Sequence, residues 1–321
     1  MAGPQFGDMQ RKALHDAFQQ TLAPSPLVAD ESVAAEVRQA ASVSFKNFIK
    51  FHWVPKDHDD FSGAHPVLIS EAEKAAIKDH ITDLMIRAPP RVRVQLSEAL
   101  SIISQHDFPK NWPGLLPKLI ERLASTDPQV LNGVLTTADS IFMRYRDQYM
   151  SSSLSEELEY SQAVVRPLLA ALQAVVALVP STLSTPPSLI LALQNAQMAA
   201  STFYSLNSPG LTDAFEETLP GWMAAFHALL VLDAPAAAEP DPEKEGALDG
   251  LKATICKCLS LFLERNEEEF AQYLQQFVQA AWTQLVAVSP NPGQDRLALQ
   301  AINFLAAVAR SVHSSLFQDQ G

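Results

Sequence analysis

The sequence predicts an all-α protein, a right-handed α-solenoid of HEAT-like helix pairs, and three observations support this prediction. Apolar residues recur at spacings of three and four along most of the 321-residue chain, which is the period of one helix face. No segment shows the alternation of apolar and polar residues that is typical of a half-buried strand. The predicted helices also group into pairs, each spanning roughly 40–50 residues, which is the period of HEAT-like repeats.

The clearest pattern lies in residues 95–146, where two proline-containing turns separate three amphipathic helices. The first helix is expected to end at Phe108-Pro109, because proline cannot continue a helix and biases the preceding residue to an extended conformation. Asp127 and Pro128 are expected to be the N-cap and first residue of the third helix. The expected buried residues are Leu96, Ala99, Leu100, Ile103, Leu115, Leu116, Leu119, Ile120, Leu123, Leu131, Val134, Leu135, Ala138, Ile141 and Phe142.

On the N-terminal side, helices are predicted over residues 9–22 and 31–53, followed by a polar, mobile loop over residues 54–69. Ser70 and Glu73 have the spacing of a capping box that opens the next helix. The side chains expected to be buried are Val37, Ala41, Phe45 and Phe48 in the helix 31–53, and Ile77, Ile81, Leu84 and Met85 in the next one. Lys46, Asn47 and Lys50 are expected on the exposed side of the helix 31–53.

On the C-terminal side, helices are predicted over residues 154–179, 189–206, 211–232, 248–264, 269–288 and 294–312. Residues 180–187 are expected to form a turn and residues 233–246 a solvated loop, since neither segment has an apolar period. Residues expected to face the core include Leu189, Leu193, Phe203, Trp222, Phe226, Phe262, Phe277, Trp282, Leu299 and Ile302. Trp112 also has core spacing.

Charge is distributed unevenly along the chain, whose net charge is −13. Residues 1–146 contain 16 Lys and Arg against 17 Asp and Glu, whereas the remaining residues contain 7 against 19. An acidic second half disfavours nucleic acid, whose phosphates it would repel, and favours basic protein partners. The alternative interpretation is that the acidic residues only keep a long helical surface soluble.

Cysteine usage and hydropathy give no sign of secretion or membrane insertion. Cys256 and Cys258 lie two residues apart on a predicted helix and point to different faces, which suits neither a disulfide nor a shared metal site. Two thiols without a disulfide framework, together with the absence of a signal peptide, indicate a reducing compartment, the cytosol or the nucleus. The most apolar run, residues 163–179, is interrupted by Arg166 and Pro167 and is short for a bilayer span, so we expect a core helix.

Support for catalysis or a metal site is weak. The chain lacks the GxSxG, GxxxxGK[ST] and HExxH motifs. His52, His58 and His65 alternate with Asp57, Asp59 and Asp60, but their spacing matches no zinc pattern and a solvated loop is the favoured interpretation. We therefore expect no catalytic residue, no cofactor and no metal site.

Several segments together resemble one branch of a known family. Residues 41–50 (ASVSFKNFIK) with Trp53 resemble the end of the importin-β N-terminal domain, and QLSEALSII with DFPKNWPGLLP resembles the repeats that follow it. The strings NGVLTTADSIFMRYR (132–146), FYSLN (203–207), WMAAFHALLVLD (222–233) and LFQDQ (316–320) resemble the exportins that return importin-α to the cytoplasm. The DFP..WP element occurs in other karyopherins, whereas the combination is specific.

This resemblance implies a nuclear transport receptor that binds Ran in its GTP form together with importin-α as cargo, and that shuttles between nucleus and cytoplasm. Contact with nuclear pore proteins and association with the nuclear envelope are further expectations from the family. The family places Ran against the inner helices of the N-terminal repeats, which here correspond to residues 31–53, 91–105 and 129–146. On the first of these helices, Lys46, Asn47 and Lys50 carry amide and ammonium groups that suit carbonyl and acidic groups of a partner. The alternative is that they are ordinary solvated residues.

The sequence departs from the family pattern at two places. Two helices of the pattern are missing between Leu22 and Val28, which puts the Ran platform in doubt. The chain also ends at Gly321, whereas the family receptors continue with further repeats. The expected domains are an importin N-terminal-type region over residues 1–53, a loop over 54–69 and HEAT-like repeats over 70–321. Two other functions stay open: a truncated solenoid that binds another basic or helical protein without transport, and an enzyme with an unrecognised site.

Overall fold

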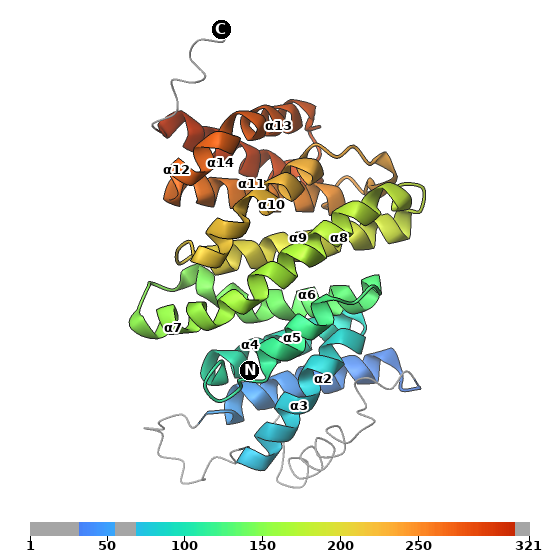
Figure 1. Ribbon diagram of the computed structural model, residues 1–321. Helices are drawn as coiled ribbons and strands as arrows, with labels where there is room; N and C mark the ends of the chain where they lie inside the picture. Colours follow the sequence, from blue (N-terminus) through green and yellow to red (C-terminus); the bar gives the residue numbers. More distant parts are fainter. Residues whose placement is uncertain (1–31, 55–68, 312–321) are drawn as a thin grey trace, which may run out of the picture. The chain divides into compact units, whose positions relative to one another are not determined.

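The computed structural model describes residues 32–54 and 69–311, and Figure 1 shows the helices that these residues form. The described residues contain no β-strand, which agrees with the predicted all-α class. The chain divides into two compact units, Met1–Leu115 and Leu116–Gly321. The predicted helix 9–22, most of the predicted loop 54–69 and the segment 316–320 lie outside the described residues.

The first unit contains α2 (Ala35–His52), α3 (Glu71–Arg87) and α4 (Pro90–Asp107), and α4 packs against both other helices. The capping box at the start of α3 is confirmed. The Glu73 backbone N–H donates to Ser70 Oγ at 3.3 Å, and the Ser70 N–H donates to Glu73 Oε2 at 2.8 Å. The predicted end of α4 is also confirmed, since Phe108 is extended before Pro109.

The predicted buried face of α2 was partly wrong. Its buried residues are Arg38, Ser42, Phe45 and Ile49, whereas Val37 is 52% exposed and Ala41 and Phe48 are only half-buried. The buried residues have the spacing of one helix face, but most of them come one position later in the sequence than the predicted ones. The face that α2 turns toward α4 therefore carries a serine and an arginine beside its apolar residues.

The second unit is built of helix pairs in two layers. In one layer α6 (Pro128–Phe142) packs on α9 (Pro186–Asn207), α9 on α11 (Ala247–Arg265), and α11 on α14 (Asp295–Arg310). In the other layer α8 (Val165–Thr182) packs on α10 (Asp213–Leu230) and α10 on α13 (Leu274–Ala287), while α8, α10 and α13 each also contact a helix of the first layer. α5 (Leu115–Leu123) begins at the boundary between the units. This is the predicted HEAT-like arrangement.

Two predicted long helices are interrupted. The helix expected over 154–179 consists of α7 (Ser152–Ser161), the 3-10 turn η2 (Gln162–Val164) and α8. Pro167 explains this break, because it lacks an N–H for the carbonyl of Ala163 and its ring would clash with that group. The helix expected over 269–288 is divided likewise into α12 (Glu267–Phe270), η4 (Ala271–Tyr273) and α13. The expected turn at 180–187 is shorter, since α8 continues through Pro180 to Thr182.

The core of the second unit centres on Phe203 of α9. Its ring centroid lies 4.7 Å from that of Trp222, 5.1 Å from that of Phe226 and 5.2 Å from that of Phe262. All four side chains are fully buried, as their spacing predicted. Aromatic contacts of this kind stabilise a core by about 0.5–1.5 kcal/mol each beyond the burial of their area. Phe203 thus joins α9, α10 and α11 into one core.

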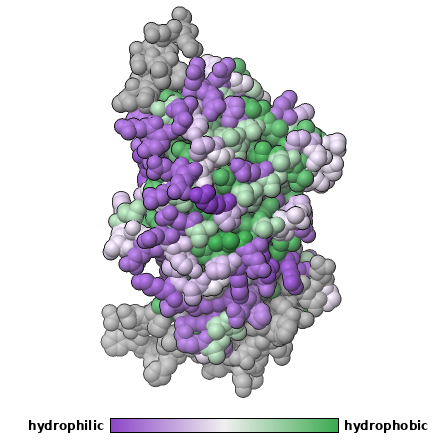
Figure 2. Space-filling view, in the orientation of Figure 1, coloured by the Kyte–Doolittle hydropathy of each residue, from purple (hydrophilic) through white to green (hydrophobic). Residues whose placement is uncertain are grey.

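Some residues that were predicted to be buried are exposed on the last described pair of helices. Trp282 on α13 is 60% exposed, and Leu299 and Ile302 on α14 are 55% and 50% exposed. Phe277 on α13 is buried as predicted, whereas α14 buries Phe304 in place of the predicted Leu299 and Ile302. The predictions for Trp282, Leu299 and Ile302 were therefore wrong. Apolar residues also reach the surface over α8 in the view of Figure 2.

The segment 233–246 is more structured than the predicted solvated loop. It contains the 3-10 turn η3 (Pro235–Ala237) and buries Ala237. Its far end is held to α14, because Arg296 Nη1 lies 2.9 Å from Glu245 Oε2. The Gly293 N–H, in the 3-10 turn η5 (Pro292–Gln294), donates to the carbonyl of Pro242 at 2.9 Å. A Cβ at Gly293 would overlap the carbonyl of Lys244, so this close approach requires glycine.

Candidate functional site

The predicted Ran-binding residues lie on the C-terminal half of α2. Asn47 and Lys50 are exposed there, and Lys50 is in the last turn, where a cation is favoured by the helix dipole. Lys46 is less accessible than predicted. Its Nζ lies 3.1 Å from Glu98 Oε2 on α4, and its side chain is only 20% exposed. The structure therefore separates the three residues into an exposed pair and a lysine that is engaged within the unit.

The ion pair between Lys46 and Glu98 affects what this face can bind. The Glu98 side chain is 54% exposed, so the pair lies at the surface, where such pairs contribute little to stability. A carboxylate of a partner would have to replace Glu98 as the partner of Lys46. Asn47 and Lys50, by contrast, are exposed and can donate to a partner without such a replacement. Asn47 and Lys50 are therefore the more accessible of the three predicted residues.

A buried cluster anchors the end of α2. Trp53 is 1% exposed, and the Nζ atoms of Lys74 and Lys78 lie 5.6 Å and 5.8 Å from its ring centroid. Lys78 Nζ also lies 2.6 Å from Asp107 Oδ2 and donates to the carbonyl of Asn111 at 3.0 Å. Lys78 thereby connects the end of α2, the middle of α3 and the turn after α4. Sequence reasoning missed Lys78, although the DFPKNWP motif marked the turn that it holds.

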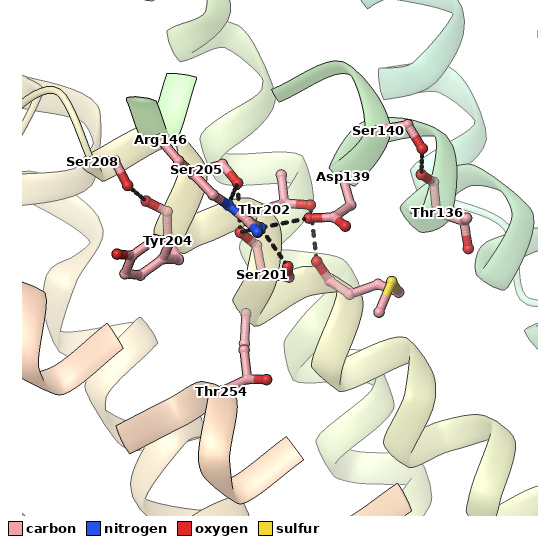
Figure 3. Close-up of polar contacts among 12 residues, drawn as sticks. Thr136, Asp139, Ser140, Arg146, Ser201, Thr202, Tyr204, Ser205, Ser208 and Thr254 are labelled. Atoms are coloured by element: carbon pink, nitrogen blue, oxygen red, sulfur yellow. Dashed lines mark hydrogen bonds and ion pairs between the residues drawn. The ribbon is translucent and has the colours of Figure 1, made fainter. Parts of the chain in front are cut away.

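The second unit contains a polar tie between α6 and α9, which Figure 3 shows. Arg146, in the 3-10 turn η1 (Met143–Asp147) that follows α6, has its Nη2 3.1 Å from Asp139 Oδ1. The same nitrogen donates to Ser201 Oγ at 2.7 Å, and Arg146 Nε donates to Ser205 Oγ at 2.9 Å. Burial raises the pKa of Asp139, against the opposing effect of Ser201 and Arg146. Sequence reasoning missed this tie.

A second polar contact joins the start of α6 to the middle of α9. Asn132 Nδ2 donates to Asn195 Oδ1 at 2.8 Å, and Asn195 Nδ2 donates to the carbonyl of Pro128 at 3.0 Å. Asn195 is fully buried, so its hydrogen bonds fix the register of α9 against α6. Arg144 pairs with Glu157, which also accepts a hydrogen bond from the Tyr145 hydroxyl at 2.7 Å. These groups are used to hold helices together.

The described residues include no group of three or more His, Cys, Asp or Glu side chains that could hold a metal ion. His58 and His65 of the predicted loop lie outside them. One helical run, Ser152–Thr182, is long and apolar enough to cross a membrane by length and composition. However, η2 interrupts the run, and α8 packs on α9 and buries Leu168, Leu172, Val175 and Val179. Core helices pass the same test, so the run is a weak indication of a membrane span.

Comparison with known families decides the classification. Residues 141–321 match the family model described as Cse1, and residues 21–87 match that of the importin-beta N-terminal domain. The chain belongs to the Cse1 family. The Cse1 model covers more than half of the chain, and the resemblance to the importin-β superfamily is confirmed. The predicted gap between Leu22 and Val28 and the predicted domain boundaries stay predictions.

Curated relatives in the Cse1 family extend beyond the region that matches this chain. Exportin-2 of Homo sapiens is 37% identical over 286 residues, and Exportin-2 of Drosophila melanogaster is 37% identical over 284 residues. Each alignment covers 88% of this chain and 29% of the relative. The chain therefore spans about three tenths of the length of the curated relatives that it matches.

Solved structures confirm the helical solenoid. The exportin Cse1 in its cargo-free, cytoplasmic state matches with a TM-score of 0.86 and 30% sequence identity, over 97% of this chain and 34% of that chain. Lph2, a bidirectional nuclear transport receptor of S. cerevisiae, matches with a TM-score of 0.63 at 15% identity over 94% of this chain, which supports the fold alone. Neither comparison tests the roles of Lys46, Asn47 and Lys50.

Proposed function

We propose that this chain is a non-catalytic scaffold of a nuclear export receptor that binds Ran in its GTP form together with importin-α. The match to the exportin Cse1 over 97% of the chain carries this proposal. The chain corresponds to about a third of that exportin, so it would supply one arch of the receptor rather than its whole cargo surface. Shuttling between nucleus and cytoplasm, contact with nuclear pore proteins and association with the nuclear envelope belong to the same proposal.

The α2 face supports a contact with Ran. Asn47 and Lys50 are exposed side by side on a helix that α4 and the Trp53 cluster hold in place. Amide and ammonium groups on a rigid helix can hydrogen-bond to carbonyl and carboxylate groups of a partner with little loss of side-chain freedom. Glu98 keeps Lys46 oriented near the same face. The acidic second half suits a basic region of the importin-α cargo.

The first experiment measures binding of the chain to Ran loaded with a non-hydrolysable GTP analogue or with GDP, with and without importin-α. We expect a preference for the GTP state that importin-α strengthens. Lys50→Glu should weaken Ran binding about tenfold, since each 1.4 kcal/mol is a factor of ten. Lys110→Glu is the matched control, because Lys110 is an exposed lysine of the same unit outside α2. Equal weakening by both substitutions would contradict the α2 assignment.

A version with the two family helices restored between Pro26 and Leu27 separates the remaining outcomes. Binding to GTP-state Ran only by the restored version would show that these helices complete the platform. Loss of binding by both versions would overturn the proposal. The remaining candidate would then be a solenoid that engages another basic or helical protein without transport.

A further inference from the structure

A polar groove lies on the first-layer helices of the second unit. It encloses about 240 Å³ between side chains of α9, α11 and α14. Tyr204, Leu261 and Ala306 contribute carbon surface, while hydrogen-bond donors come from the polar residues Lys257, Ser260, Gln300, Asn303 and Arg310. This volume is sufficient for one or two side chains of a partner. The ion pairs and hydrogen bonds that tie α6 to α9 do not fill it.

Basic residues gather at this groove although the surrounding region is acidic. Residues 147–321 contain 7 Lys and Arg against 19 Asp and Glu. Of these seven, Lys257 and Arg310 line the groove, and Arg265 donates to the carbonyl of Ser208, one turn beyond Tyr204. With Glu264 as the carboxylate of the lining, the two lining cations leave the groove with a net positive charge inside an acidic region, which attracts a small anionic group.

The ring of Tyr204 contacts two cations, Lys257 of the groove and Arg146 of the tie between α6 and α9. Lys257 Nζ lies 4.2 Å and Arg146 Cζ lies 5.5 Å from the centroid of its ring. The cation–π contact with Lys257 keeps this ammonium near one wall of the groove. The ammonium of Lys257 is therefore positioned before a ligand arrives, which reduces the entropy lost on binding.

We propose that this groove is a docking site for an acidic peptide segment of a protein partner. Carboxylates of the segment would bind Lys257 and Arg310, with Gln300 and Asn303 donating further hydrogen bonds, and its methylene groups would lie on Tyr204 and Leu261. Nucleic acid is disfavoured, because a long polyanion would also meet the nineteen acidic residues of this region. The site is separate from the α2 face.

Glu264 sets a limit on the affinity of this site. Glu264 lines the same groove, and its negative charge partly cancels the positive charges of Lys257 and Arg310. A partner carboxylate would be repelled by Glu264, so removal of this charge should strengthen binding. The proposal therefore predicts that removing the Glu264 charge increases affinity, while removing a cation decreases it. A gain in affinity is not what a disturbed fold would produce.

The test uses fluorescence anisotropy with a fluorescein-labelled peptide of about twelve residues in which Glu and Asp alternate with Ala, at low ionic strength where such pairs are strongest. A peptide with Gln and Asn in place of Glu and Asp is the control ligand. We expect binding of the acidic peptide only, weakening as salt is added. Arg310→Glu and Lys257→Glu should each reduce affinity about tenfold, whereas Glu264→Gln should increase it about threefold.

Arg166→Glu is the matched control variant, because it changes the net charge equally at an exposed position on α8, where Arg166 Nη2 lies 2.6 Å from Glu217. It should leave peptide binding nearly unchanged. Equal weakening by Arg166→Glu and Arg310→Glu, or equal binding of the amide peptide, would overturn the proposal. Lys50→Glu should not affect the peptide, so failure here and failure of the Ran proposal are distinguishable. Far-UV circular dichroism of each variant checks folding.

Discussion

Lys74 and Lys78 show how one turn of helix separates a surface residue from a structural one. Both ammonium groups lie within 6 Å of the Trp53 ring, as their distances of 5.6 Å and 5.8 Å show. Lys74 pairs at 2.8 Å with Glu71, whose side chain is 85% exposed. Lys78 pairs at 2.6 Å with Asp107, and both of those side chains are only 13% exposed. Solvent therefore screens the first pair more strongly than the second.

We predict that Lys78→Met destabilises the first unit by about 2–4 kcal/mol, because it leaves the largely buried Asp107 carboxylate and the Asn111 carbonyl without their donor. Lys74→Met is the matched control and should cost less than about 1 kcal/mol. Urea denaturation followed by circular dichroism measures both, and hydrogen exchange of the α3 and α4 amides locates the effect. Similar losses in the two variants would show that burial does not distinguish these lysines.

The two cysteines are expected to be inert in the folded protein. Burial raises the pKa of Cys256 to about 12 and also raises the pKa of Cys258, whose Sγ donates to the carbonyl of Ala200 at 3.4 Å. Because only the thiolate is a good nucleophile, neither thiol should react with a disulfide reagent near pH 8, and both should react after denaturation in urea. Rapid labelling of one thiol in the native state would contradict the burial of α11.

At the scale of elements, the tie between α6 and α9 combines an ion pair with buried hydroxyl groups. Arg146 reaches Asp139, Ser201 and Ser205, and Asn195 is buried at the other end of the same interface. Removing one member of such a network leaves its partners unsatisfied, which costs more than the net contribution of one hydrogen bond. The spacing of these contacts fixes how α9 lies along α6.

The pH dependence of the free energy of unfolding should show that the pKa of Asp139 is raised in the folded state. Burial raises its folded pKa above the ordinary value of 3.8, so the folded state keeps this proton to a higher pH than the unfolded state. Its contribution to stability is therefore complete below pH 3.8 and is lost as pH rises through the folded pKa. The stability of Asp139→Asn relative to the wild type should accordingly increase between about pH 4 and pH 7. A decrease would mean that attraction to Arg146 outweighs burial.

Element boundaries were largely predictable, because prolines and capping residues act locally. Ser70 with Glu73 and Asp127 with Pro128 mark helix starts that the structure confirms. Buried faces were predicted well for α6 and α9 and less well for α2 and α14. Val37 on α2 and Ile302 on α14 are apolar but exposed, so the apolar pattern alone does not determine which face of a helix is buried.

The polar contacts were less predictable than the elements. Asp139 and Arg146 lie seven residues apart, which places them on one side of a helix and was a usable signal. Ser201 and Ser205 come from a helix more than fifty residues away, and nothing in their local sequence identifies Arg146 as their partner. The groove at Tyr204 likewise depends on three helices and could not be located before their packing was known.

At the scale of the second unit, the distribution of apolar residues on α13 and α14 separates a packed face from an uncovered one. Phe277 and Phe304 are fully buried, whereas Trp282 on the same helix as Phe277 and Ile302 on the same helix as Phe304 are at least half exposed. Apolar residues that are exposed in the folded state contribute little to its stability, because folding removes little of their surface from water. Their burial would have to come from another surface that covers these helices.

We therefore predict opposite results for neighbouring substitutions on the same helices. Trp282→Ser and Ile302→Ser should each change the free energy of unfolding by no more than about 0.5 kcal/mol, as for surface positions. Phe277→Ala and Phe304→Ala should each cost about 3–5 kcal/mol, because they remove buried rings and leave cavities. Thermal and urea unfolding of the four variants measures these differences. Acrylamide quenching provides an independent check, since Trp282 should be quenched readily while Trp53, Trp112 and Trp222, which are at most 5% exposed, should be protected. A large loss of stability in Trp282→Ser would mean that this face is covered in solution, and the dependence of that loss on protein concentration would show whether a second copy of the chain covers it.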